Sequence, residues 1–263
     1  MQIALIAVDM DGTFLRPDLS YDRQRFLGLR ERMRDAGVRF VVASGNQYWQ
    51  LRSFFEPEDE VAYAAENGHF LYDVGDTSPC YAAVPRPDVA RVLVAELEEH
   101  RLTYLASTSH GAVIPSWLGP DGVAWARRYY PRVEIVEDVR AVADDIVKAS
   151  VQAEDPHAVV AELGRRLGDR FVPVVAGPTD ADLNAPGHNK AVGLGRLAER
   201  WGIDLADAVA FGDSYNDREM LTAVGLPVVM SDAPPDLREL AARIAPPNSA
   251  DGVLAVLEEI LPS

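Results

Sequence analysis

The sequence predicts an α/β protein whose core is a doubly wound parallel sheet, with an α+β unit inserted into it. Short apolar runs alternate with helix-period segments at both ends of the chain, which is the pattern of parallel strands joined by helices. In the middle third, adjacent strand pairs replace this alternation. With 263 residues and 48% hydrophobic content, the chain is long and apolar enough to bury a sizeable core.

The N-terminal part begins with an apolar run at residues 3–8, which predicts a buried parallel strand. A helix is expected over residues 21–36, because Gly37 suits the position after a helix end. The other elements expected before residue 83 alternate in the same way: strand 38–43, helix 47–55, strand 61–64 and a hairpin strand at 70–72.

The insert is expected at residues 83–186, and residues 1–82 and 187–263 are expected to form the core domain. The insert mixes helices with neighbouring strand pairs, which predicts an α+β cap in which one face of an antiparallel sheet is covered. The expected helices are 87–100, 123–130 and 156–167, and the expected strands are 102–106, 112–114, 133–136, 146–152, 171–175 and 182–185. Residues 85–87 and 185–187 are the predicted hinges. The core pattern then resumes with helix 191–201, strand 208–211, helix 217–224, strand 227–230 and helix 252–261.

Two carboxylates follow the first predicted strand, Asp9 and Asp11, and Gly12 allows a sharp turn directly after them. Such a pair can hold a hard cation and leave one carboxylate free for acid–base work. An EF-hand loop is excluded, because it requires a further ligand before its glycine. On its own, this motif is equally compatible with an ordinary turn.

Polar clusters also follow other predicted strands or open a helix. Ser44, Gly45 and Asn46 follow strand 38–43, and Lys190 opens helix 191–201. The segment after strand 208–211 contains Asp213, Ser214, Tyr215, Asn216 and Asp217. The carboxyl ends of parallel strands meet at one edge of a sheet, so these side chains are expected to share a site there.

With these motifs, the chain resembles the haloacid dehalogenase (HAD) superfamily of phosphatases. The segments 42–51 and 65–68 look like the Cof-type branch, subfamily IIB, and most like bacterial sugar phosphatases with Ser-Gly-Asn in the second motif. The resemblance covers nearly the whole chain, although the middle third matches mainly in its element pattern. It implies a HAD-like core with a C2-type cap and hydrolysis of small phosphorylated metabolites, most simply sugar phosphates, through an aspartyl-phosphate.

The resemblance implies a role for each motif. Asp9 would be the nucleophile and Asp11 the general acid and then base, while Ser44 and Lys190 would bind the phosphate. Asp9, Asp213 and the backbone carbonyl of Asp11 would hold Mg²⁺. The residues expected to support the phosphate or the metal ligands are Gly12, Gly45, Asn216 and Asp217. A purely structural role remains an alternative for three of them: Asp9 as a structural metal ligand, Asp11 as a turn-capping aspartate and Lys190 as a surface lysine.

Departures from the family pattern concern specificity. Asn46 stands where arginine is commoner, so its amide is expected to bond a sugar hydroxyl, and Tyr215 is expected to narrow the pocket. The polar residues expected to face the site from the cap side are His110, Asn184, His188 and Asn189, together with Asp182 and Ser107. Each of these taken alone is more simply structural. His69 and His157 are predicted at the surface, and Trp125 in an apolar core stripe.

Composition narrows the class of protein. A net charge of −16 argues against nucleic-acid binding, and no apolar run is long enough for a membrane span. Cys80 is the only cysteine, so no internal disulfide forms, and with no signal peptide recognisable, a cytoplasmic location is expected. Only Lys148 and Lys190 among the 25 basic residues are lysines, and Lys148 has no assigned role.

The sequence thus predicts a Mg²⁺-dependent phosphatase whose partner is a small phosphorylated substrate and which is a monomer or a small homo-oligomer. Two alternatives stay open. One is a phosphohexomutase of the same fold, and the other is a non-catalytic protein that binds a phosphorylated metabolite.

Overall fold

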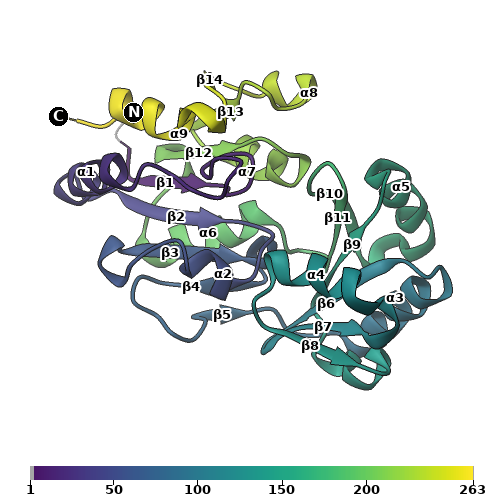
Figure 1. Cartoon of the computed structure of the whole chain (residues 1–263). Coiled ribbons are helices and arrows are strands. Elements are labelled where there is room, and N and C mark those ends of the chain that lie inside the picture. Colours follow the sequence, from purple (N-terminus) through teal and green to yellow (C-terminus); the bar gives the residue numbers. More distant parts are fainter. Residues whose placement is uncertain (1–2, 263) are drawn as a thin grey trace.

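The computed structural model describes residues 3–262 and confirms the predicted α/β class. Figure 1 shows two lobes, each built around its own sheet. The sheet of the first lobe has eight strands in the order β14-β13-β12-β1-β2-β3-β4-β5. Their bounds are β1 Leu5–Val8, β2 Arg39–Ala43, β3 Val61–Ala65, β4 Phe70–Tyr72, β5 Tyr81–Ala82, β12 Ala208–Gly212, β13 Leu226–Met230 and β14 Arg243–Ala245. The strands from β14 to β3 run parallel, and β4 and β5 add an antiparallel edge.

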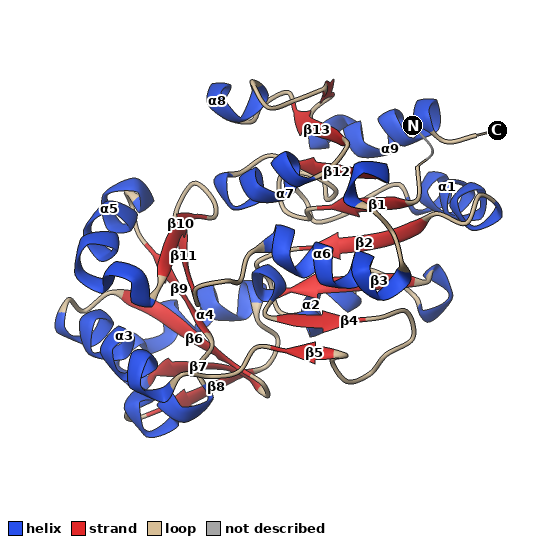
Figure 2. Ribbon diagram, turned by 180° about the vertical axis from the view of Figure 1, so that it is seen from behind, coloured by secondary structure: helices blue, strands red, loops and turns tan. Residues whose placement is uncertain are grey.

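Helices cover both faces of this sheet, as the doubly wound prediction requires (Figure 2). Apolar side chains that alternate along each strand point to opposite faces, so each face packs on its own set of helices. One set is α1 Arg23–Asp35, α2 Tyr48–Arg52 and α9 Gly252–Ile260. The other set is α6 Lys190–Trp201, α7 Arg218–Ala223 and α8 Pro235–Arg238.

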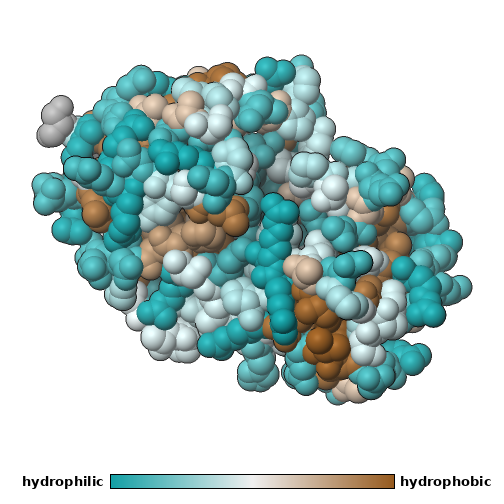
Figure 3. Space-filling view, in the orientation of Figure 1, coloured by the Kyte–Doolittle hydropathy of each residue, from teal (hydrophilic) through white to brown (hydrophobic). Residues whose placement is uncertain are grey.

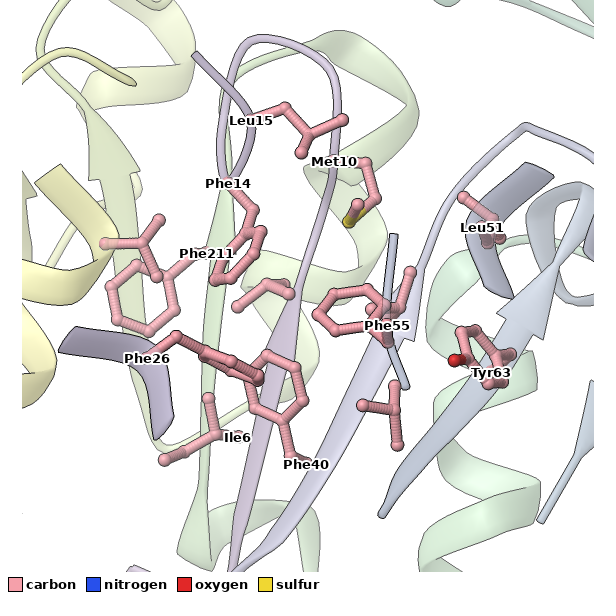
Figure 4. Packing of buried hydrophobic residues seen from close by; sticks show 14 of the residues in the cluster. Ile6, Met10, Phe14, Leu15, Phe26, Phe40, Leu51, Phe55, Tyr63 and Phe211 are labelled. Atoms are coloured by element: carbon pink, nitrogen blue, oxygen red, sulfur yellow. The ribbon is translucent and has the colours of Figure 1, made fainter. Parts of the chain in front are cut away.

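An aromatic cluster fills the core under the loop that follows β1 (Figure 4). The rings of Phe26 and Phe40 lie 5.3 Å apart, and Phe14 meets Phe26 edge-on at 5.5 Å. Aromatic pairs in tilted or edge-on contact add to the stability that burial supplies. Phe14 belongs to the loop itself and is buried, as are Met10 and Leu15. The core therefore anchors the segment that carries Asp9 and Asp11.

The second lobe contains a six-stranded sheet in the order β10-β11-β9-β6-β7-β8. Its strands are β6 Thr103–Thr108, β7 Gly111–Pro115, β8 Val133–Val136, β9 Lys148–Gln152, β10 Val172–Val175 and β11 Asp180–Asn184. The pairs β6–β7 and β10–β11 are antiparallel, as predicted. The sheet is not wholly antiparallel, however, because β7 and β8 pair in parallel. Helix α4, Gly119–Tyr129, connects these two strands, and a crossover of this kind is what a parallel pair needs.

Helices pack on both faces of this second sheet. On one face, Leu105, Ala112 and Ile114 pack on α4. The opposite face packs on helices α3, Pro87–Glu99, and α5, Pro156–Leu167. Along β9, Ala149 and Val151 point to that face, so Lys148 and Ser150 point to the other. This second face looks toward the first lobe, because the Lys148 side chain reaches Gly45 there.

Three short elements lie outside the predicted set: β5, α8 and β14. None is long enough to show a period in the sequence. None of the helices in residues 3–262 combines the length and apolarity that crossing a bilayer demands. Figure 3 shows that the face seen in Figure 1 is largely hydrophilic, with hydrophobic residues gathered in small patches.

Candidate active site

The site lies where the strand order of the first sheet reverses. β1 pairs with β2 on one side and with β12 on the other, so the chain crosses to opposite faces from this strand. Ligands of open α/β sheets collect outside the carboxyl ends of strands at such a point. Asp9 follows β1, Ser44 follows β2, and Asp213 follows β12.

A buried ion-pair triad forms the floor of the site. The Lys190 ammonium lies 2.6 Å from Asp9 Oδ1 and 2.7 Å from Asp217 Oδ1. Lys190 opens α6, whose first turn is capped by Asn189, the side chain of which accepts from the Val192 amide at 2.8 Å. The cap sets the start of the helix and thereby the position of the lysine.

Burial and charge set the protonation of this triad. Burial raises the pKa of Asp9 well above its usual value, and the neighbouring carboxylates add to this, while Lys190 opposes it. Burial would lower the pKa of Lys190, but Asp217 and Asp9 together raise it. Lys190 therefore stays charged, and a second positive charge close by would favour the ionised form of Asp9.

Asp213 is held by the loop that follows β1. The Thr13 hydroxyl donates to Asp213 Oδ1 at 2.6 Å. Gly12 has a φ of +80°, and a Cβ there would come within 2.4 Å of Asp213 Oδ2, so only glycine fits. Burial and the charge of Asp217 raise the pKa of Asp213 to about 7.

These carboxylates form a cluster suited to a divalent cation. Oxygen atoms of Asp9, Asp213 and Asp217 lie within 4.8 Å of one another. Asp217 already accepts from Lys190 and from the amides of Asp213 and Ser214. Beside them, Asn216 Oδ1 is buried without a hydrogen-bond partner among the described residues. Hard oxygen ligands and an unused buried acceptor fit Mg²⁺ and its bound waters.

Asp11 is held by Asn46, whose amide nitrogen donates to Asp11 Oδ2 at 2.6 Å. From the sequence, this amide was expected to bond a substrate hydroxyl. In the structure it bonds the Asp11 carboxylate instead. Burial raises the pKa of Asp11, and the hydrogen bond from Asn46 lowers it by a smaller amount. A carboxyl group with a raised pKa is suited to donate a proton near neutral pH.

A cavity of about 330 Å³ opens over these groups, between the two lobes. Asp9, Asp11, Ser44, Asn46 and Asp213 line it from the first lobe. The lining residues of the second lobe are Leu105, Trp125, Arg128, Tyr129, Tyr130, Ser150, Ala176, Gly177, Pro178, Asp180 and Asp182. The remaining lining residues are Gly12, Arg16, Pro17, Leu19, Gly45, Asn216 and Asn248.

Five residues expected to set specificity do not line this cavity. His110 is exposed in the turn after β6, and Tyr215 directs its hydroxyl to Asp236 at 3.2 Å. The other three have structural partners: Asn184 accepts from Asn67, His188 stacks on His69, and Asn189 caps α6.

Two further predictions need correction. His69 was expected at the surface but is fully buried between the lobes, where its Nε2 accepts from the Ala185 amide. Trp125 is buried as predicted, yet it also lines the cavity, and its indole N–H donates to Asp180 Oδ1 at 3.0 Å. His157 is exposed, as expected.

Most of the second-lobe residues that line the cavity were not predicted from the sequence, although two sequence patterns indicate them. In β9 and β11, polar and apolar residues alternate, which places Ser150, Asp180 and Asp182 on one face. In α4, Trp125 and Tyr129 are four residues apart and so share one side of the helix. Neither pattern says which face meets the site.

Comparisons with known proteins identify the family and the fold. The family described as haloacid dehalogenase-like hydrolase matches residues 6–257. The chain is 37% identical to the 5-amino-6-(5-phospho-D-ribitylamino)uracil phosphatase YbjI of Escherichia coli (strain K12), over 99% of this chain and 97% of that protein. The structure of SMU.1108c from Streptococcus mutans UA159 matches with a TM-score of 0.91 at 26% identity, over 98% of both chains. The HAD subclass IIB sugar phosphatase BT4131 has the same fold, with a TM-score of 0.81 at 17% identity over 97% of this chain and 98% of that one.

Proposed function

The chain belongs to the haloacid dehalogenase-like hydrolase family, and on that premise we propose that it is a Mg²⁺-dependent phosphatase of small phosphorylated metabolites. The observation that carries the proposal is the buried triad of Asp9, Lys190 and Asp217 beside Asp213, at the bottom of a cavity of metabolite size.

In the first step, an Asp9 oxygen attacks phosphorus and the bond from phosphorus to the leaving oxygen breaks. Lys190 keeps the attacking carboxylate oriented and offsets the charge of the phosphoryl group. Asp11 gives its proton to the leaving oxygen, so that the product departs as an alcohol. The result is an aspartyl-phosphate on Asp9.

In the second step, water attacks the phosphorus of the aspartyl-phosphate. Asp11, now ionised, takes a proton from this water, and the bond from phosphorus to Asp9 breaks. Inorganic phosphate is released, and both carboxyl groups return to their starting states. The hydroxyl of Ser44, which lines the cavity, would donate to a phosphoryl oxygen in both steps.

Asp9, Asp213 and the backbone carbonyl of Asp11 would hold Mg²⁺, and Asn216 would support its waters. When bound, the ion supplies positive charge that lets an anionic carboxylate approach a phosphate dianion. Asp217 would act indirectly, because its oxygens are already engaged by Lys190 and by two amides.

The cavity favours a leaving group with hydroxyls and a flat ring. Asp180 and Arg128 present charged groups that can bond hydroxyls, while Trp125 and Tyr129 present aromatic surface. The relative YbjI is named for a substrate that joins a phosphoribityl chain to a uracil ring. A sugar or polyol phosphate, with or without such a ring, is the substrate class that this lining supports.

The test is phosphate release from a panel of three compounds: a hexose phosphate, 5-amino-6-(5-phospho-D-ribitylamino)uracil and p-nitrophenyl phosphate. We expect hydrolysis with Mg²⁺, without a bisphosphate activator, and none in excess chelator. Asp9→Asn should fold normally and lose nearly all turnover, because an amide is a poor nucleophile. Full activity in chelator would contradict the metal assignment, and a variant within about tenfold of wild type would remove Asp9 as nucleophile.

A further inference from the structure

A buried lysine, Lys148, joins the two lobes beside the cavity. Its side chain is only 1% exposed, although it starts β9 in the second lobe. Burial by itself would lower the pKa of Lys148, but Asp182, Tyr130 and Glu66 raise it, so the ammonium stays charged. A buried charge is retained only where its surroundings compensate it. Lys148 is not used by the chemistry proposed above.

The ammonium of Lys148 reaches across to the phosphate side of the site. It donates to the carbonyl oxygen of Gly45 at 2.7 Å, and Gly45 lies between Ser44 and Asn46 in the loop after β2. The Tyr130 hydroxyl oxygen lies 3.2 Å from the same carbonyl oxygen and gives its proton to Glu66. The second lobe thus holds the middle residue of the loop whose neighbours meet the phosphate and Asp11.

Two carboxylates compensate the lysine, one from each lobe. Asp182 of the second lobe lies 3.0 Å from the ammonium, and Glu66 of the first lobe lies 3.6 Å away. Each also accepts across the lobe boundary: Asp182 from Asn67 at 2.6 Å, and Glu66 from Tyr130 at 2.7 Å. Neither carboxylate keeps all its partners if the lobes separate, so the network is complete only when they are docked as here.

The loop is also pressed directly against the second sheet. A Cβ at Gly45 would lie 2.8 Å from Asp182 Oδ2, so the close approach requires glycine. Gly45, Tyr130 and Asp182 all line the cavity. The network is therefore the wall between the space for the leaving group and the loop that carries Ser44.

We propose that Lys148 is a positioning residue for phosphoryl transfer, which fixes the Ser44–Asn46 loop through the Gly45 carbonyl when the lobes dock. This rests on the proposed phosphatase function. The loop serves every substrate, so loss of Lys148 lowers turnover of large and small phosphate esters by the same factor. A residue that acts only on the leaving group would affect large substrates alone.

Lys148→Met keeps most of the side-chain volume and removes the charge. We expect kcat to fall by about tenfold to a hundredfold on both a sugar phosphate and p-nitrophenyl phosphate, because small misplacements of catalytic groups have effects of this size. KM should change less than kcat. Ser107→Ala is the matched control: contrary to expectation, Ser107 does not line the cavity, and its substitution removes a hydrogen bond to Glu66 in the same network without touching Gly45. Its kcat should stay within about threefold of wild type.

If Lys148→Met does not fold, the test uses the double variant Lys148→Met/Glu66→Gln, because it removes one buried charge of each sign. The single variant Glu66→Gln is then the reference. A folded Lys148 variant with the kcat of its reference overturns the proposal, and so does a loss confined to the sugar phosphate. Wild-type protein that releases no phosphate would instead refute the proposed function itself.

Discussion

At the scale of single residues, the chemistry of the site depends on which atom each polar side chain hydrogen-bonds. Asn46 shows this clearly: its amide nitrogen is 2.6 Å from Asp11 Oδ2, so it supports the proposed acid–base residue. Thr13 does the same for Asp213. Both contacts join strand-end loops that are neighbours only in the folded sheet.

We predict that Asn46→Ala lowers kcat/KM on every phosphate ester. A hydrogen bond to a charged group contributes about 1.5–3 kcal/mol, so the loss should be roughly tenfold to a hundredfold. Steady-state kinetics on a sugar phosphate and on p-nitrophenyl phosphate will measure it. A loss seen with the sugar phosphate alone would favour the original interpretation, in which the amide contacts a sugar hydroxyl.

At the scale of elements, α6 approaches the turn after β3 so closely that a side chain has no room. Gly68 has a φ of +80°, and a Cβ there would lie 2.6 Å from the Asn189 carbonyl oxygen. The helix that carries Lys190 is positioned by this backbone contact.

We predict that Gly68→Ala destabilises the protein by about 2 kcal/mol or more, because the new methyl group meets backbone in a left-handed conformation. Gly28→Ala is the control, since Gly28 lies in α1 with nothing within 4 Å of a Cβ there. That change should stabilise by about 0.5–1 kcal/mol, because alanine is the better helix former. Urea unfolding of both variants is the measurement, and equal effects would refute the argument.

The two chain crossings between the lobes meet at His69. Its backbone carbonyl accepts from the Ala83 amide at 2.7 Å, and its Nε2 accepts from the Ala185 amide at 3.2 Å. Nδ1 faces the Glu66 carbonyl at 2.5 Å, so Nδ1 carries the proton. Burial, aided by His188, lowers the pKa of His69 well below its ordinary value of 6.5.

This depressed pKa has a consequence for stability. The unfolded chain binds a proton at His69 below about pH 6.5, while the folded chain does not until a lower pH. Neutral, buried His69 therefore makes its full contribution to the free energy of unfolding above about pH 6.5. As the pH falls below this value, the free energy of unfolding decreases by at most about 1.4 kcal/mol per pH unit because of this group. The variant His69→Gln keeps an acceptor for the Ala185 amide. Its free energy of unfolding, measured in urea, should fall less steeply than that of wild type between about pH 6.5 and pH 5. Identical pH slopes for the two proteins would contradict the prediction.

At the scale of the whole molecule, the cavity exists only between the lobes. The first lobe supplies the groups proposed for phosphate chemistry, and the second supplies Trp125, Tyr129, Ser150 and Asp182. Selection among substrates should therefore depend on residues from α4, β9 and β11 rather than on the turn that contains His110.

We predict that Tyr129→Ala distinguishes two substrates that share a polyol and differ in a ring. It should lower kcat/KM for 5-amino-6-(5-phospho-D-ribitylamino)uracil by about tenfold, because an aromatic contact is lost, and leave ribitol 5-phosphate nearly unchanged. His110→Ala, outside the cavity, should change neither. Equal losses on both substrates would mean that the second lobe acts only as a lid.

The sequence alone was enough for the order of elements and for the motifs at the strand ends. A strand or a helix reveals itself through periods of a few residues, and Asp9, Ser44, Lys190 and Asp213 each stand beside such a segment. The family match and the fold confirm the predicted family and fold class. The elements β5, α8 and β14 were not predicted, since each has four residues or fewer and is too short to repeat a pattern.

Only the tertiary structure decided which residues meet between the lobes. Lys148 is 103 residues from Gly45, and Asp182 is 115 residues from Asn67, yet each pair is in hydrogen-bond contact. The alternation within a strand assigns residues to a face but does not say what that face covers. The docking of the two sheets settles this, and it depends on the summed packing of both lobes rather than on any local pattern. For that reason the sequence could place His69 at the surface and Trp125 in an apolar stripe, whereas the fold buries the first between the lobes and opens the second to the cavity.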